Sequence, residues 1–148
     1  MKIRFYRGAR IFFAHKARHW EILLFRRAIS PYKGYWSVLG GKSKSNEEFR
    51  ETACREASEE AFKGVRLEDC LKKYLSSDFD MSKVPEEIYS SWFFYKWRNY
   101  LVKLAEKPPM DLFKLNYEND SARWFSVMDL PSMVFPGVSR SIKKFGLL

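Results

Sequence analysis

The chain has 148 residues, which is enough for one domain with a sizeable core. Apolar residues make up 46% of it and aromatic residues 18%, which excludes a disordered chain. The net charge is +9, and such a positive excess would attract polyanions such as nucleotides or nucleic acid, although general solubility explains it equally well.

The first 41 residues predict strands separated by turns. Residues 1–14 are rich in Ile, Phe and Tyr and predict one strand, or two that are interrupted at Gly8. Residues 20–27 (WEILLFRR) predict a clear strand, and residues 30–35 predict a loop because they contain proline and glycine. A short apolar segment, residues 36–39, then ends at the double glycine Gly40-Gly41.

A helix is predicted to begin near Asn46 and to stop at Gly64. Ser45 followed three positions later by Glu48 matches a capping box, and a glycine is the usual residue just beyond a helix. The inward face of this helix repeats every four residues, as Phe49, Ala53, Ala57 and Ala61.

The remainder of the chain predicts more strands and a last helix. Residues 70–80 and 89–104 predict strands, and the second is apolar on both faces and therefore central. Residues 123–127 predict a short strand, and residues 131–145 hold a helix entered near Pro136. This mixture indicates a single domain over residues 1–148, of α+β class or an α/β sandwich.

Carboxylates gather on the predicted helix. Of the 18 acidic residues, six lie between Gly41 and Lys63, and Glu56, Glu59 and Glu60 are spaced to share one helical face. Like charges at this spacing repel one another and destabilise a helix, whereas a hard cation such as Mg²⁺ or Mn²⁺ would make them favourable. A solvated acidic face is the alternative explanation.

The spacing of these residues resembles the signature of the Nudix hydrolases. A glycine, a glutamate six positions later and an Arg-Glu-x-x-Glu-Glu cluster match seven of its nine specified positions: Gly41, Glu47, Arg55, Glu56, Ala57, Glu59 and Glu60. Flanking residues are similar as well, so the resemblance extends over roughly residues 8–145: LLFRR, Trp36, Arg123-Trp124-Phe125 and Asp129-Leu130-Pro131.

Two positions depart from the family pattern. The family's glycine and aliphatic residue fall on Phe62 and Lys63, and Gly64-Val65 supplies that pair two residues later. We therefore expect the helix to run half a turn further before a left-handed cap. Leu39 stands where the family has a proline. Neither departure changes a carboxylate.

The resemblance implies a fold and an activity. The fold would be an α/β/α sandwich with a mixed β-sheet between helices. The activity would be hydrolysis of a pyrophosphate bond in a nucleoside diphosphate linked to another group, with Mg²⁺ or Mn²⁺ and an attacking water. Divalent ions would neutralise the phosphate charge and lower the pKa of bound water.

The resemblance also implies which residues hold the metal and the phosphates. By position, Glu56, Glu59 and Glu60 would be metal ligands, and the Gly40 carbonyl would complete the site. Gly40 and Gly41 would let the backbone approach the phosphates closely, because neither has a Cβ.

Supporting and catalytic roles fall on four residues. Arg55 would orient Glu56 or brace the loop. Glu47, two helical turns before Arg55, would support the site structurally or through a metal-bound water, or else complement the helix dipole. The general base would be Glu56, with Glu118 in the loop before the last strand as the second candidate.

The sequence indicates the residues that contact the phosphates and the base less specifically than it indicates the metal ligands. Arg26 and Arg27 end a strand close to the box, and strand alternation allows only one of them to face the site; we select Arg27 as the phosphate contact. Four aromatic residues are candidates to stack on a base, although most of them are expected in the core: Tyr32, Tyr35, Trp36 and Phe79. A marker proline or tyrosine of some Nudix subgroups is absent from residues 77–81, so no substrate is selected.

The sequence also predicts binding partners and a cellular location, with alternatives left open. A nucleotide-type small molecule is the expected substrate, and an RNA 5′ end would suit the positive charge. The alternative is a non-catalytic Nudix-fold module that binds nucleotide or RNA. Cys54 and Cys70 match no metal motif, and we find neither a signal peptide nor a membrane segment, so we expect a cytoplasmic protein without a membrane partner, as a monomer or homodimer.

Overall fold

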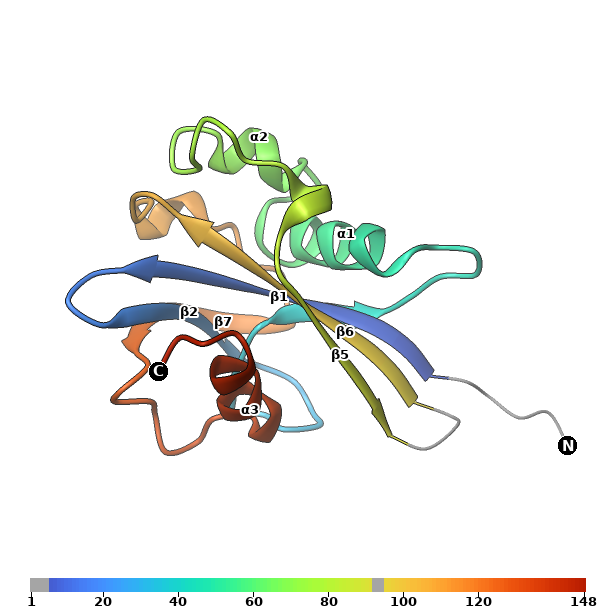
Figure 1. Cartoon of the computed structure of the whole chain (residues 1–148). Coiled ribbons are helices and arrows are strands. Elements are labelled where there is room, and N and C mark those ends of the chain that lie inside the picture. The colour runs from blue at the N-terminus through green and yellow to red at the C-terminus, as the bar shows by residue number, and fades with distance from the viewer. Residues whose placement is uncertain (1–5, 92–94) are drawn as a thin grey trace, which may run out of the picture.

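A seven-stranded mixed sheet is the middle layer of the computed structural model, which describes residues 6–91 and 95–148. Helices α1 (Phe49–Ala61) and α2 (Leu67–Leu71) lie on one face of this sheet, and α3 (Pro136–Lys144) lies on the other (Figure 1). The predicted α/β/α arrangement with a mixed sheet is therefore confirmed. Among these residues no helix is both long and apolar enough to cross a bilayer.

Strand β1 (Tyr6–Lys16) organises the sheet. Along one edge it pairs in parallel with β6 (Tyr95–Leu104). Along the other edge it pairs antiparallel with β4 (Leu39–Lys42) and then with β2 (Trp20–Arg27), so both strands share β1. Three further strands extend the sheet: β3 (Trp36–Ser37) and β7 (Asn119–Ser126) pair with β2, and β5 (Glu86–Ser91) pairs with β6.

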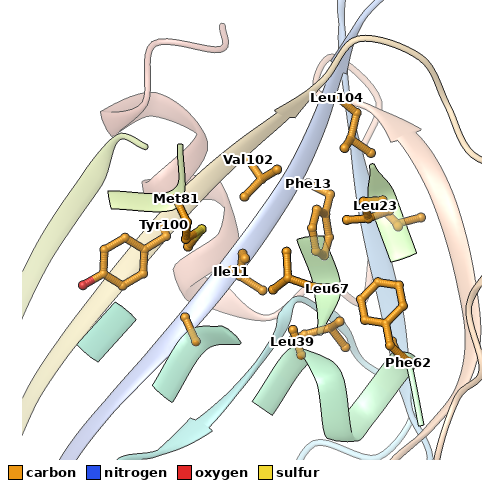
Figure 2. Packing of buried hydrophobic residues seen from close by; sticks show 14 of the residues in the cluster. Ile11, Phe13, Leu23, Leu39, Phe62, Leu67, Met81, Tyr100, Val102 and Leu104 are labelled. Atoms are coloured by element: carbon orange, nitrogen blue, oxygen red, sulfur yellow. The ribbon is translucent and has the colours of Figure 1, made fainter. Parts of the chain in front are cut away.

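The alternation of side chains along β1 divides the core into two clusters. Ala9, Ile11 and Phe13 lie on the α1 side, where Figure 2 shows Ile11 and Phe13 within the larger cluster. Phe12 and Ala14 lie on the α3 side. Each face of β1 therefore packs against its own hydrophobic cluster. The position of a side chain along β1 decides whether it contacts the α1 layer or the α3 layer.

Helix α1 begins at Phe49, and its predicted inward face is confirmed. Ala53, Ala57 and Ala61 are fully buried, and these small side chains let the helix pack closely on the sheet. The predicted capping box is wrong, because Glu48 occupies the N-cap position without a side-chain hydrogen bond.

Glu47 takes part in the helix start instead. Its Oε1 accepts hydrogen bonds from the Lys44 N–H at 3.0 Å and from the Thr52 hydroxyl at 2.8 Å. These two bonds connect the preceding turn to the first turn of α1, where free backbone N–H groups and the helix dipole also favour a carboxylate.

The predicted extension of α1 beyond Ala61 is wrong. Phe62 is the cap residue, and the chain turns through Lys63 at φ 50° and Gly64 at φ 77°, both in the left-handed region. Phe62 is 3% exposed and packs against the Phe113 ring at a centroid distance of 5.7 Å. An aromatic side chain thus fills the core at a position where the family pattern has glycine.

One predicted strand is wrong, and another is divided into two. Residues 70–80 contain the end of α2 and turns, because Leu67 and Leu71 bury a helical face and the polar residues that follow favour turns. Residues 89–104 belong to two antiparallel strands, β5 and β6, with residues 92–94 outside the described ranges. Only β6 is the interior strand that was predicted. Strand β7 begins four residues before the predicted residue 123, and the final helix is confirmed.

Candidate active site

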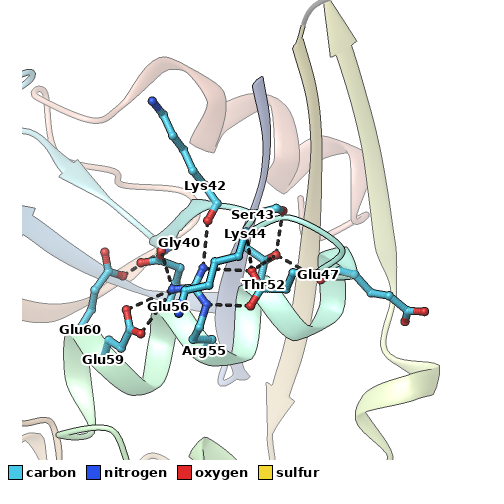
Figure 3. Close-up of polar contacts among 11 residues, drawn as sticks. Gly40, Lys42, Ser43, Lys44, Glu47, Thr52, Arg55, Glu56, Glu59 and Glu60 are labelled. Atoms are coloured by element: carbon cyan, nitrogen blue, oxygen red, sulfur yellow. Dashed lines mark hydrogen bonds and ion pairs between the residues drawn. The ribbon is translucent and has the colours of Figure 1, made fainter. Parts of the chain in front are cut away.

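Helix α1 presents Glu56 and Glu60 to the double glycine of β4. Glu60 is only 4% exposed, and the Gly40 N–H donates a hydrogen bond to its Oε2 at 3.0 Å (Figure 3). The Glu56 carboxyl lies directly over Gly41, since a Cβ added there would be 2.5 Å from the Glu56 Cδ. The structure therefore brings together four of the predicted site residues: Gly40, Gly41, Glu56 and Glu60.

The segment before β7 brings Glu118 to the same place. The Lys114 N–H donates to the Ala61 carbonyl at 2.7 Å, and the Asn116 N–H donates to the Glu60 carbonyl at 3.0 Å. The Glu118 N–H in turn donates to the Asn116 Oδ1 at 2.9 Å. These bonds fasten the segment to the end of α1 and leave the Glu118 carboxyl beside that of Glu60.

Burial governs the charge of the two inner carboxyls. It raises the pKa of Glu60 to about 10, with the neighbouring Glu118 carboxyl as a further cause and the Gly40 N–H opposing. Burial also raises the pKa of Glu56, while the Arg55 guanidinium opposes the rise. Both groups are thus poorly compensated as anions, which is the condition that a bound cation relieves.

Arg55 is the cation that the chain itself supplies. Its Nε donates to Glu47 Oε2 at 2.7 Å, and its Nη1 donates to Glu56 Oε1 at 3.1 Å and to Glu59 Oε2 at 3.2 Å (Figure 3). The Arg55 hydrogen bond is the main reason that the pKa of Glu47 falls to about 2. Arg55 therefore holds Glu47 and Glu56 in place, and its predicted role as an orienting residue agrees with these contacts.

Glu59 lies apart from the inner pair. Its side chain is 49% exposed, compared with 16% for Glu56, and it contacts Arg55 on the solvent side. Over residues 6–91 and 95–148, no three His, Cys, Asp or Glu side chains are arranged to hold a metal ion. The Arg55 Nη1 contacts both Glu56 and Glu59, so the guanidinium supplies the cation that these two carboxylates share.

The donor set nevertheless suits a hard divalent cation. Glu56 and Glu60 provide carboxylate oxygens, and the backbone of Gly40 lies within hydrogen-bond distance of Glu60. Such oxygen ligands are the ones that Mg²⁺ and Mn²⁺ prefer. The roles of Glu59 and of the Gly40 carbonyl as ligands stay predictions.

A cavity of about 440 Å³ adjoins the double glycine, and both Glu60 and Arg27 line it. The Arg27 Nε donates to the Pro31 carbonyl at 2.8 Å, which holds the side chain beside the cavity. Arg26 instead forms an ion pair with Asp120. Of the two arginines, the structure thus directs the selected one toward the site.

The candidate stacking residues lie in different environments in the structure. Tyr32 is half exposed, lines the cavity and contacts the Phe135 ring at a centroid distance of 5.0 Å. Trp36 packs against Phe125, and Phe79 packs against the larger core cluster. Tyr32 is therefore the member of that set that remains available to a base.

Arg10 and Trp97 are cavity residues that the motif did not indicate. The Arg10 Cζ lies 4.1 Å from the Trp97 ring centroid and 5.0 Å from the Phe135 ring centroid. Burial lowers the pKa of Arg10. The available signal was weak: an arginine directly before an apolar run, residues 11–14.

Comparisons with known proteins agree with this architecture. A family model described as NUDIX domain matches residues 5–145. A C. elegans Ap4A hydrolase in a binary complex is 20% identical, with a TM-score of 0.67 and coverage of 94% of this chain and 95% of that one. A NUDIX hydrolase from Nitrosomonas europaea is 19% identical, with a TM-score of 0.62 and coverage of 98% and 72%.

A third similar structure is a bifunctional NMN adenylyltransferase/ADP ribose pyrophosphatase from Francisella tularensis, complexed with AMP and Mn ion. It is 17% identical, with a TM-score of 0.59, and the match covers 99% of this chain and 38% of that one. No curated protein matches the chain. Identities this low show a shared fold, whereas the family model covers nearly every residue. The chain therefore belongs to the NUDIX domain family.

Proposed function

We propose that the protein is a metal-dependent pyrophosphohydrolase that cleaves a nucleoside diphosphate linked to another group. The observation that carries this proposal is the half-buried Glu56 carboxyl and the buried Glu60 carboxyl, held against Gly40-Gly41 with Glu118 alongside. A fold does not need three acidic groups in one poorly solvated place, because their burial and mutual repulsion are unfavourable. A reaction on a phosphoric anhydride does need them.

Each residue has a distinct task in this proposal. Glu56 and Glu60 would hold Mg²⁺ or Mn²⁺ together with the Gly40 carbonyl. When bound, the ion would neutralise phosphate charge and lower the pKa of a coordinated water. Arg55 keeps Glu56 oriented through its 3.1 Å hydrogen bond, and Gly41 leaves room for that carboxyl.

The proton of the attacking water needs an acceptor. Glu118 and Glu56 are the two candidates, and both carboxyls lie within the same acidic cluster. Glu118 is carried by a segment fastened to α1, so it can accept a proton without belonging to the helix. We therefore propose Glu118 as the base and Glu56 as the residue that holds the ion.

Nucleotide-type substrates are supported by the cavity and by the relatives. The cavity combines the cationic side chains of Arg10, Arg27 and Lys42 with aromatic rings, which suits phosphates attached to a base. The names of two similar proteins, an Ap4A hydrolase and an ADP ribose pyrophosphatase, describe substrates of this class.

A substrate panel with matched variants tests the proposal. We expect the wild type with Mg²⁺ or Mn²⁺ to hydrolyse at least one member of a panel of nucleoside triphosphates, ADP-ribose, nucleotide sugars, dinucleoside polyphosphates and 5′-triphosphate RNA. We expect Glu60→Gln to lower kcat/KM by about 10³-fold or more, since it removes a metal-holding charge. Glu51→Gln is the control, because Glu51 is exposed on the same helix.

A second pair of variants tests the base. Glu118→Gln should lower kcat by about 10²- to 10⁴-fold, whereas Asp120→Asn, two residues later in an exposed ion pair with Arg26, should leave kcat near that of the wild type. Glu59→Gln tests the outer carboxylate in the same assay. Full turnover by folded Glu60→Gln would contradict the proposal, and nucleotide binding without hydrolysis would favour the non-catalytic alternative.

A further inference from the structure

Arg10 is a half-buried cation at the cavity that lacks an ionic partner. It forms no ion pair with any carboxylate of residues 6–91 and 95–148. The eight residues outside these ranges include no Asp or Glu. Every other arginine that lines the site region has a hydrogen-bond acceptor: Arg27 contacts the Pro31 carbonyl and Arg55 contacts Glu47. A desolvated charge without a partner is costly, so this arrangement calls for an anion.

Aromatic rings fix the Arg10 guanidinium at the cavity. The Trp97 and Phe135 rings pack against it at 4.1 and 5.0 Å, and cation–π contacts of this kind hold the group without using its N–H donors. The Trp97 ring can lie there only because residue 8 is glycine, since a Cβ on Gly8 would come within 2.6 Å of the ring. The Tyr95 hydroxyl contacts the guanidinium, and the other N–H donors in its plane remain for a ligand.

The surroundings of Arg10 favour an anionic ligand over a neutral one. Arg27 and Lys42 line the same cavity, and Glu60 is the carboxylate among its described lining residues. The charges of Arg27 and Arg140 act repulsively on Arg10. An anion relieves this repulsion, whereas a neutral base edge offers hydrogen bonds only. The planar fork of an arginine matches phosphate oxygens in pairs.

Arg10 also lies on the other side of the sheet from the acidic cluster. Its Cα is next to Gly40 in the β1–β4 register, but its side chain contacts Phe135 and Trp97 near α3, whereas Glu56 and Glu60 come from α1. The same cavity connects the two sides, because Gly40 and Glu60 line it together with Arg10. A ligand that reaches both must therefore extend beyond the two phosphates at the carboxylates.

We propose that Arg10 is a specificity-determining residue that binds a phosphate group beyond the diphosphate held at Glu56 and Glu60. The protein would then select nucleotides that carry three or more phosphates in a row over those with a single diphosphate. This inference rests on the proposed function, because that function places the reacting diphosphate.

Binding measurements with a phosphate series test the inference. The probes are AMP, α,β-methylene ADP and an analogue of ATP in which methylene groups replace both bridging oxygens of the triphosphate, titrated calorimetrically with Mg²⁺ present. We expect Arg10→Met to weaken binding of the triphosphate analogue by about 10- to 100-fold, the range of a charge-assisted hydrogen-bond pair, and AMP by less than about threefold. Arg10→Lys keeps the charge but loses the fork, so its loss should be intermediate.

A matched arginine outside the cavity provides the control. Arg123 also lies over an aromatic ring, that of Phe125 at 5.5 Å, and it is exposed. Arg123→Met removes the same charge and should bind all three probes like the wild type. Thermal unfolding of each variant shows that it is folded. If Arg10→Met does not fold, Arg10→Lys gives the comparison. A competition experiment on the wild type adds a second test. In it, inorganic tripolyphosphate should displace the triphosphate analogue far better than orthophosphate does.

Several outcomes would overturn the inference. They are an equal loss for AMP, the ADP analogue and the ATP analogue, no loss in either variant, or tripolyphosphate no better than orthophosphate. Binding is measured without turnover, so the two proposals separate. Selective binding that depends on Arg10 in a protein that hydrolyses nothing would overturn only the proposed function. Hydrolysis with selectivity unchanged by Arg10→Met would overturn only this inference.

Discussion

Arg55 shows how a single residue makes a crowded acidic helix tolerable. Its guanidinium contacts Glu47, Glu56 and Glu59, and its Nη2 also donates to the Lys42 carbonyl at 3.0 Å. It therefore offsets repulsion along α1 and joins that helix to the end of β4. In the outer part of the site, the Arg55 guanidinium thus neutralises the carboxylate charges. In the inner part, around Glu60, no such cation among the described residues contacts the carboxyl.

Gly41 sets the approach between the helix and the strand. A Gly41→Ala change places a Cβ 2.5 Å from the Glu56 Cδ, so the carboxyl must move. We expect kcat/KM to fall by about 10²-fold, because displacement of about 1 Å at a reacting centre has this size of effect. Stability should fall by about 1–3 kcal/mol. Turnover and urea unfolding are the measurements.

Gly137 offers the control for that substitution. It lies in the first turn of α3, and an added Cβ would meet its neighbours at 3.5 Å or more, which is ordinary contact. Gly137→Ala should therefore retain activity and stability, since alanine favours a helix. Wild-type kinetics for Gly41→Ala would show that Glu56 need not occupy its place over the glycine.

Residues of the acidic box were predictable because a helix fixes their separation in space. Glu56, Arg55 and Glu60 have known relative positions as soon as the helix is assigned. Arg10 and Trp97 were not predictable, because their contact depends on which strands pair. No local sequence pattern in either segment indicates that β1 and β6 are neighbours.

The end of α1 is where this chain departs from the family's sequence pattern. Phe62 closes the core against Phe113, and the left-handed turn passes to Lys63 and Gly64. The same helix end receives the segment that carries Glu118, through the bond from Lys114 to Ala61. Packing at this point therefore positions a residue of the site.

Substitution of Phe62 measures that packing. Phe62→Gly, which restores the family residue, should lower the free energy of unfolding by about 3–5 kcal/mol, because it leaves a cavity in the core. Phe62→Leu should cost less than about 1.5 kcal/mol, since much of the volume is kept. Urea unfolding monitored by tryptophan fluorescence gives both values. A Phe62→Gly protein as stable as the wild type would show that the core closes without the ring.

Elements were predicted well where the pattern fits one kind of structure and poorly where it fits two. The continuous apolar run within residues 20–27 and the alanine face of α1 gave correct assignments. Residues 70–80 failed because a brief apolar run fits a strand or a helix equally, and burial of Leu67 and Leu71 decided for a helix. The division between β5 and β6 was missed because the apolar character continues across it.

At the scale of the whole molecule, the cavity draws on all three layers. Glu60 comes from α1, Gly40 and Arg10 come from the sheet, and Phe135 immediately precedes α3. A ligand held between these layers stabilises the folded chain as a unit, because the unfolded chain offers no such site.

Metal addition should therefore raise the unfolding temperature. At Mg²⁺ concentrations about 100 times the Kd, we expect about 2.7 kcal/mol of added stability, or roughly 5–10 °C in Tm. Differential scanning fluorimetry can follow the rise and its reversal by EDTA. Glu51→Gln should retain the shift and Glu60→Gln should lose it. An equal shift in both variants would assign the effect to ions bound elsewhere.

The parallel pairing of β1 with β6 has a consequence for how the protein is made. β1 leaves the ribosome before its parallel partner, Tyr95–Leu104, and the residues between must be synthesised first. Until then β6 is absent, and the aromatic side chains of nascent β1, Phe12 and Phe13 included, are exposed and prone to aggregation. Translation speed and chaperone capture across that interval should thus govern how much of the polypeptide reaches its native state.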